Sequence, residues 1–189
     1  REEFSLENLK AFRDASPCLG GSFDAFSDQI AEADLEQTHI DLAADYAALF
    51  LGMSPNPVAP YESVYVSGEE LLMQDARDEV LALYRDEDLV KTSHFNLPED
   101  HIAVELAYMN ALCRYTYEAY DAGDRDAVCS YEEKQAHFVL EHLAKWVPQF
   151  CVDVKGSAKT DFYKGLAEIT EFFLAMEIRS LQDSPHAAV

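Results

Sequence analysis

The sequence predicts an all-α protein, a single bundle-like domain of about six or seven helices. Apolar residues recur every three or four positions in several long segments, and the seven glycines and seven prolines cluster at the breaks between them. No stretch alternates polar and apolar residues as a strand would, apart from the brief run at 63–66. With 189 residues, 49% of them apolar, the chain is long enough to bury a hydrophobic core.

Four helices after residue 35 show a clear apolar stripe. Their stripe residues are, helix by helix, Leu42, Tyr46, Leu49 and Met53; Leu72, Ala76, Val80 and Leu83; Val139, Leu143, Val147 and Phe150; and Phe162, Leu166, Ile169, Phe173 and Met176. Pro148 is expected to end or kink the third of these helices, because proline lacks a backbone N–H. Two shorter stretches, at 6–12 and 23–30, also favour helix.

The segment from residue 98 to about residue 120 is apolar on most of its faces, which predicts a central helix of the bundle. Pro98 suits the first turn of this helix. Glu99 and Asp100 would complement the positive end of its dipole.

A break at residues 91–97 precedes the central helix and predicts a hinge. The chain, 1–189, is then one domain with an N-terminal lobe at about 1–90 and a C-terminal lobe at 98–182.

A second irregular segment, at 52–68, contains three of the seven prolines. Loops of this length in compact domains are usually functional or disordered. Because Tyr61, Val64 and Tyr65 would favour burial, we expect this loop to pack and to carry function.

The charge balance restricts the partners. With 36 acidic and 14 basic residues, the formal net charge is −22, which disfavours nucleic acid and anionic lipid and favours basic partners. The alternative is that the acidic residues only keep an apolar protein soluble. No signal peptide is visible, and no apolar run approaches the roughly 20 residues of an integral membrane segment. The four cysteines are widely spaced without a zinc-binding pattern, which fits a reducing cytoplasm. Three of them lie in segments expected to be helical or to end a helix, which predicts small buried side chains.

Two groups of side chains invite a metal interpretation. His137, Glu141 and His142 lie close together on one helix, and His101 and Glu105 are four residues apart on another. Neither spacing matches the Glu-x-x-His motif of di-iron bundles or the HExxH zinc motif, so no metal site is predicted. The sequence also has no GxSxG motif and no glycine-rich phosphate loop, which predicts no catalytic residue, no cofactor and no enzyme.

His101 and Glu105 would lie side by side on one helix face, beside the apolar Ile102 and Met109. One interpretation is a local His–Glu pair that orders the start of the helix. The other is a polar mouth, together with Asp100, of an apolar groove that receives a guanidinium group.

Two stretches carry a resemblance to a known family. The first consists of Tyr61, Glu62, Ser63, Val64 and Tyr65, and the second of Pro98, Glu99, Asp100, His101, Glu105 and Leu106. Further matches, in the expected order, are YAALFLG at 46–52, then Phe138, His142, Leu143 and Trp146, then Asp161, Phe162 and Tyr163. On these stretches the sequence resembles the TorD/DmsD/NarJ family of redox-enzyme maturation chaperones over residues 35–181.

The resemblance implies an all-helical, non-enzymatic chaperone of the bacterial or archaeal cytoplasm. It would bind the twin-arginine leader, and the body of the precursor, of a molybdopterin-containing anaerobic oxidoreductase until the cofactor has been inserted. For some members it also implies a domain-swapped homodimer and weak guanine-nucleotide binding. The peptide-binding residues implied by the two stretches are Asp100, His101, Glu105, Glu99, Tyr61, Glu62, Ser63, Val64 and Tyr65.

Two other functions stay open at this point. An acidic helical adaptor would bind many basic amphipathic segments without requiring an arginine pair. A metalloprotein of the bundle type would hold a stoichiometric metal ion.

Overall fold

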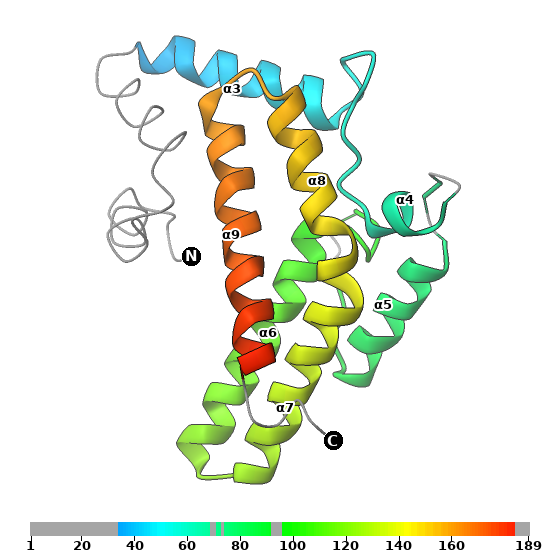
Figure 1. Cartoon of the computed structure of the whole chain (residues 1–189), viewed down its shortest axis with the longest axis vertical. Helices are drawn as coiled ribbons and strands as arrows, with labels where there is room; N and C mark the ends of the chain where they lie inside the picture. The colour runs from blue at the N-terminus through cyan, green and yellow to red at the C-terminus, as the bar shows by residue number, and fades with distance from the viewer. Residues whose placement is uncertain (1–33, 69–70, 73, 92–95, 184–189) are drawn as a thin grey trace. The chain divides into compact units, whose positions relative to one another are not determined.

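The computed structural model describes residues 34–68, 71–72, 74–91 and 96–183, and this part of the chain is helical (Figure 1). Its elements are α3 (Leu35–Phe50), α4 (Glu62–Val66), α5 (Asp75–Asp86), α6 (Ile102–Ala122), α7 (Arg125–Phe138), the π-helical η2 (Val139–Leu143), α8 (Ala144–Ser157) and α9 (Asp161–Asp183). No strand occurs among these described residues, and the all-α prediction is confirmed. The helices expected at 6–12 and 23–30 lie outside them.

The chain forms two compact units. The described residues of the first unit are 34–58 and 151–173, and those of the second are 59–68, 71–72, 74–91, 96–150 and 174–183. Helices α8 and α9 therefore contribute residues to both units. Helices α5 and α6, on either side of the expected hinge, both belong to the second unit, and the hinge stays a prediction.

In the first unit, a buried carboxylate joins α3 to the residues just before α9. Asp45 accepts hydrogen bonds from the backbone N–H groups of Lys159 and Thr160 and from the Thr160 hydroxyl at 2.7 Å. The stripe expected for α3 is therefore only partly correct, because Leu49 is buried but Tyr46 is 45% exposed and Asp45 takes a place in the core. A buried carboxylate is tolerated there because several donors satisfy it.

In the second unit, α6 and α7 form an antiparallel hairpin (Figure 1). The turn uses Gly123, whose φ of 74° lies in the left-handed region that glycine adopts without strain, and Asp124 caps the first turn of α7. The ring of Tyr108 lies 4.8 Å from that of Tyr84 and 4.8 Å from that of Phe138, centroid to centroid. These three buried rings form the centre of the unit's core.

The central helix differs from its prediction in two respects. α6 begins at Ile102 with His101 as its N-cap, so Pro98 lies in a turn before the helix and not in its first turn. Nor is the helix buried on all faces, because Leu106, Tyr117 and Tyr120 are exposed. Its buried residues are Val104, Glu105, Tyr108, Leu112 and Ala119.

The stripe predicted around Pro148 is confirmed, but the proline does not end its helix. Val139, Leu143, Val147 and Phe150 are all buried, and α8 continues to Ser157. Burial of these side chains offsets the hydrogen bond that the proline removes.

The stripe predicted for α9 is not the buried face. Leu166, Phe173 and Met176 are exposed, whereas Ala167 and Leu174 are buried.

The described cysteines differ in burial. Cys151 is buried as expected, while Cys113 and Cys129 are exposed.

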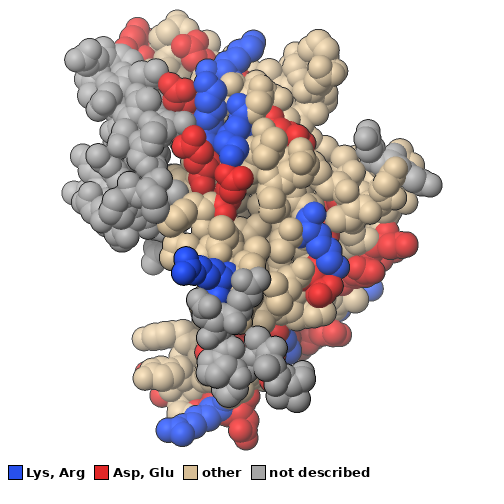
Figure 2. Space-filling view, in the orientation of Figure 1, with Lys and Arg blue, Asp and Glu red and all other residues tan. Residues whose placement is uncertain are grey.

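Charged side chains on the described surface form local pairs. Figure 2 shows acidic and basic side chains next to one another at several places on the drawn face. Two such pairs are Lys145 with Glu141, at 2.7 Å, and Lys155 with Glu171, at 2.6 Å. No helix in the described ranges is long and apolar enough to cross a membrane.

Candidate functional site

The two stretches that carried the resemblance meet in the second unit. Tyr61 and His101 form an isolated antiparallel bridge, although 40 positions separate them in the sequence. The Glu62 N–H donates to the Asp100 carbonyl at 3.0 Å, and the Ile102 N–H donates to the Pro60 carbonyl at 3.0 Å. The half-buried rings of Tyr61 and His101 pack edge to face, with centroids 5.1 Å apart. The structure thus brings together residues that local spacing alone could not place side by side.

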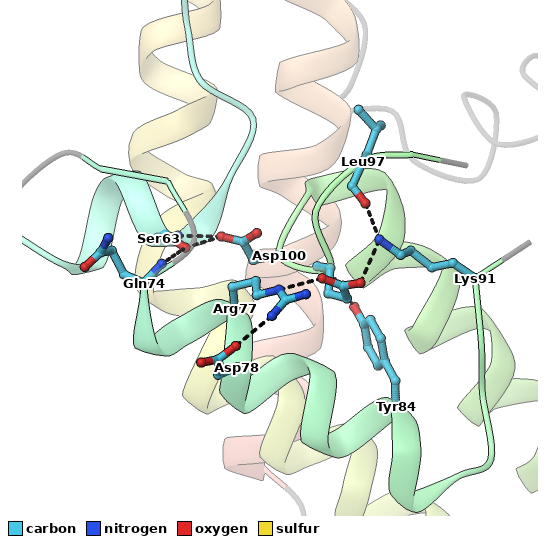
Figure 3. A network of polar contacts seen from close by, with 9 residues as sticks. Ser63, Gln74, Arg77, Asp78, Tyr84, Lys91, Leu97 and Asp100 are labelled. Carbon is cyan, nitrogen blue, oxygen red and sulfur yellow. Dashed lines mark hydrogen bonds and ion pairs between the residues drawn. The ribbon is translucent and has the colours of Figure 1, made fainter. Parts of the chain in front are cut away.

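The side chain of Asp100 links the turn before α6 to α4 through hydrogen bonds (Figure 3). It is fully buried, and its Oδ2 accepts hydrogen bonds from the Ser63 N–H, at 3.1 Å, and from the Ser63 hydroxyl. The same hydroxyl accepts from the Gln74 N–H at 3.4 Å. Asp100 Oδ1 is also buried and has no hydrogen-bond partner among the described residues. Asp100 therefore makes a long-range contact that the sequence did not predict, and its expected interaction with the helix dipole stays a prediction.

Glu99 is paired within the chain. It lies 2.6 Å from Arg77 Nε and 2.7 Å from Lys91 Nζ, and its backbone carbonyl accepts from the Tyr84 hydroxyl at 3.1 Å. Burial alone would raise the pKa of Glu99, but hydrogen bonds from Lys91 and Arg77 outweigh it and lower that pKa. Its ion pairs link Arg77 of α5 and Lys91 to the turn before α6.

Glu62 and His142 form a second buried pair. The imidazole Nδ1 lies 3.0 and 3.2 Å from the two oxygens of the Glu62 carboxylate, and both side chains are almost fully buried. His142 stacks on Phe138 with ring centroids 4.9 Å apart. The sequence analysis considered His142 as a metal ligand and as part of the family resemblance, but not as a partner of Glu62. Its pairing with Glu62, 80 residues away, has no local signal.

Glu105 is the third fully buried carboxylate. Its Oε2 accepts from the indole Nε1–H of Trp146 at 3.0 Å, while its Oε1 has no partner in the described part of the chain. Burial raises the pKa of Glu105 well above its usual range, and the charges of Glu62 and Asp100 raise it further, while the bond from Trp146 acts against them. We call Glu62, Asp100 and Glu105 the carboxylate cluster.

The expected side-by-side pair of His101 and Glu105 does not form. His101 is the N-cap, with an extended backbone, and its Nδ1 accepts from the Ala103 N–H at 3.0 Å. The i, i+4 rule applies only when both residues are helical. Burial lowers the pKa of His101, against a smaller opposing effect of Asp100, so its neutral, accepting form is favoured near neutral pH. Glu105 instead points to Trp146 on α8.

The remaining residues of the first stretch pack nearby. Tyr65 lies against Trp146 and Phe150, with centroids 5.6 and 6.4 Å apart, which confirms that this part of the loop packs. The run at 63–66 is helical, within α4, and not a strand. Val64, like Tyr65, is half-buried.

Two cavities adjoin the site. The first, of about 320 Å³, runs along α6 past Ala103, Ala107 and Ala111, opposite Tyr84 and Val90. Its lining is predominantly apolar. The second, of about 450 Å³, is acidic, and its charged lining residues are Glu62, Asp75, Glu79, Glu141 and Lys145. On α6, the lining of the apolar cavity begins at Ala103, three residues after Asp100 in the sequence.

No group of three or more His, Cys, Asp or Glu side chains in the described ranges is arranged to hold a metal ion. His101 caps the start of α6, and His142 is paired with Glu62. The two sets of candidate metal ligands considered from the sequence therefore do not form one site. The geometry therefore adds no support to the bundle-metalloprotein alternative.

Comparisons with known proteins agree with the two stretches. A family model described as nitrate reductase delta subunit matches residues 16–152. The chain belongs to this family. Several relatives in this comparison are named Chaperone protein TorD. These names describe chaperones and not enzymes, in agreement with the non-catalytic expectation.

Three of these relatives show the extent of the likeness. The protein of Photobacterium profundum is 30% identical over 142 residues, 75% of this chain and 64% of the relative. That of Aliivibrio fischeri is 26% identical over 170 residues, 88% of this chain and 76% of the relative. That of Shewanella pealeana is 29% identical over 154 residues, 78% of this chain and 63% of the relative. The chain spans slightly less than two thirds of the first and third relatives.

Proposed function

We propose that this chain is a cytoplasmic redox-enzyme maturation chaperone. It binds the twin-arginine leader, or the apo form, of a molybdopterin-containing anaerobic oxidoreductase and assists cofactor insertion before export. Family membership and the names of its relatives support the chaperone function. The observation that carries leader binding is the carboxylate cluster, in which one buried oxygen of Asp100 and one of Glu105 have no hydrogen-bond partner among the residues that the structure describes.

A guanidinium group fits the chemistry of these oxygens. It carries five N–H donors in a planar fork and one positive charge. Asp100 Oδ1 and Glu105 Oε1 are acceptors that lack a donor in the described part of the chain, and the one imidazole of the cluster is paired with Glu62. Because buried acceptors and charges are costly when unpaired, an inserted arginine would stabilise the cluster. Since both residues are fully buried, the arginine enters after a local opening at half-buried Tyr61 and His101.

The apolar cavity along α6 would take the apolar stretch that follows the arginines. Burying about 400 Å² of apolar leader surface offers on the order of 10 kcal/mol gross, at about 25 cal/mol per Å². Ordering the peptide consumes much of this. The apolar contact therefore dominates affinity, while the carboxylates and His101 select the arginine pair and orient the leader.

The test separates charge from structure at Asp100. Asp100→Asn keeps an oxygen that can accept from Ser63, but it places an NH₂ donor where the unpaired oxygen lies. We expect calorimetric titration with a synthetic leader to show at least tenfold weaker binding, about 1.4 kcal/mol, with an unchanged melting temperature. Asp121→Asn, at the exposed other end of α6, is the matched control. Unchanged affinity in a folded Asp100→Asn variant would reduce Asp100 to a structural residue.

Changes in the leader distinguish this function from that of a general acidic adaptor. Replacing both arginines by lysines should weaken binding modestly, since lysine keeps the charge and loses the planar fork. Charges placed in the apolar stretch should weaken it more. An adaptor for basic segments would bind the lysine leader equally well. If charges in the apolar stretch left affinity unchanged, the proposal that this stretch binds in the apolar cavity along α6 would be wrong.

A further inference from the structure

The carboxylate cluster has more acceptors than its surroundings can satisfy. Glu105 on α6 is faced by Glu62 from α4, by Asp100 from the preceding turn, by Tyr84 from α5 and by Trp146 from α8. Trp146 donates to one Glu105 oxygen, and His142 of η2 lies against Glu62. Arg77 and Lys91 are paired with Glu99. Ser63 donates its N–H and its hydroxyl to one oxygen of Asp100. The second oxygen of Asp100 and the second oxygen of Glu105 are left without a donor among the described residues.

A proton on Glu105 would remove part of this imbalance. A protonated carboxyl is a donor as well as an acceptor, so Glu105 could donate to the Glu62 carboxylate, whose charge acts on it directly. The proton would also reduce the repulsion among the three carboxyls. Burial and the neighbouring charges raise the pKa of Glu105 well above its usual range, which agrees with this arrangement.

We propose that in the free protein the carboxylate cluster holds one exchangeable proton on Glu105, directed toward Glu62, and that an arginine guanidinium entering the cluster displaces this proton to solvent. The inference rests on the proposed function, because it assigns the guanidinium to the same site. The exchange is balanced: one positive charge enters with the arginine, one leaves as the proton, and the net charge of the cluster is unchanged.

The pH dependence of binding follows from this exchange. The guanidinium stabilises the ionised form of Glu105, so the bound cluster keeps its proton only at lower pH than the free cluster does. At pH values between the pKa of the bound cluster and that of the free cluster, binding releases about one proton. The dissociation constant then falls about tenfold for each unit by which pH rises. Leader binding is therefore weak in acid and strengthens toward neutral pH.

The experiment counts the released protons. Calorimetric titrations of the full chain are run in buffers of different ionisation enthalpy, with a synthetic twin-arginine leader that has a blocked N-terminus and no histidine. We expect release of about one proton per leader near neutral pH. In Glu105→Gln this release should disappear and the pH dependence should flatten. Glu118→Gln, an exposed change on the same helix, should retain both.

The outcomes separate the two proposals. If the wild-type chain binds no leader at any pH, the proposed function fails. If it binds the leader without proton release, or if Glu105→Gln still releases the proton, leader binding stands and the proton exchange is wrong. Infrared spectroscopy of the wild type tests the loss of the proton on leader binding even if the Glu105→Gln variant does not fold. A buried protonated carboxyl shows a C=O band that must vanish when the leader is added, and its persistence would overturn the exchange.

Discussion

The two oxygens of Asp100 have different surroundings, and two substitutions separate them. Oδ2 accepts from Ser63, and Oδ1 has no described partner. Asp100→Ala leaves the buried Ser63 N–H without its acceptor, which should cost about 1–3 kcal/mol of unfolding free energy. Asp100→Asn keeps an acceptor and should cost much less. Chemical denaturation of the two variants checks this, and equal losses would mean that the Ser63 contact contributes little to stability.

Glu105 makes the stability of the fold depend on pH. In the unfolded chain it ionises near the usual glutamate pKa, but in the folded chain that pKa is raised well above this value, first by burial and then by Glu62 and Asp100. Between these two pKa values the folded state binds more protons, so stability falls as pH rises, by at most about 1.4 kcal/mol per unit.

Glu105→Gln should remove this dependence, because an amide oxygen can still accept from Trp146 but does not ionise. Relative to wild type, the variant should gain unfolding free energy as pH rises through that window. Denaturation curves at several pH values measure the gain. If the difference in unfolding free energy between the variant and the wild type stayed constant with pH, Glu105 would not titrate within this pH window.

At the scale of helices, periodicity predicted the existence of the main elements better than their ends or faces. The stripe of Val139, Leu143, Val147 and Phe150 was correct because apolar burial is a local pattern repeated at every turn. The start of α6 was wrong because Asp100 bonds to Ser63, 37 residues away, and no local rule reports such a contact. The composition of the candidate site was visible in the sequence. The pairing of its members was not.

Asp45 provides a test of one such long-range contact in the first unit. Asp45→Ala removes the acceptor of two backbone N–H groups and one hydroxyl at residues 159 and 160. By analogy with lost caps and buried acceptors, we expect a loss of about 2–3 kcal/mol of unfolding free energy.

Asp41→Ala is the matched control for Asp45→Ala. Asp41 is exposed on the same helix, where it accepts from Gln37. Its loss should change stability by less than about 0.5 kcal/mol in denaturant titrations. A small effect at Asp45 as well would show that water replaces its contacts.

For the molecule as a whole, the net charge of −22 bears on encounter with a basic leader. Because exposed charges act over about one Debye length, added salt should slow association by about tenfold or more while leaving dissociation nearly constant. Stopped-flow measurements over a range of salt concentrations separate the two rates. If salt changed dissociation instead, solvent-exposed charge pairs would contribute to holding the leader in the complex, because buried pairs are screened much less.

The π-helical segment η2 fixes the spacing of the chain between Phe138 and Trp146. An α-helix turns about 100° per residue, so one extra residue in a wide turn rotates every later side chain by that angle relative to a regular helix. His142 lies within the wide turn and reaches Glu62, and Trp146 follows it and reaches Glu105. Deleting a single residue there would therefore leave the helix intact and aim both side chains away from their partners. For an engineer, substitutions at the exposed Leu140 and Glu141 should therefore be tolerated in this segment, whereas a change of its length should not.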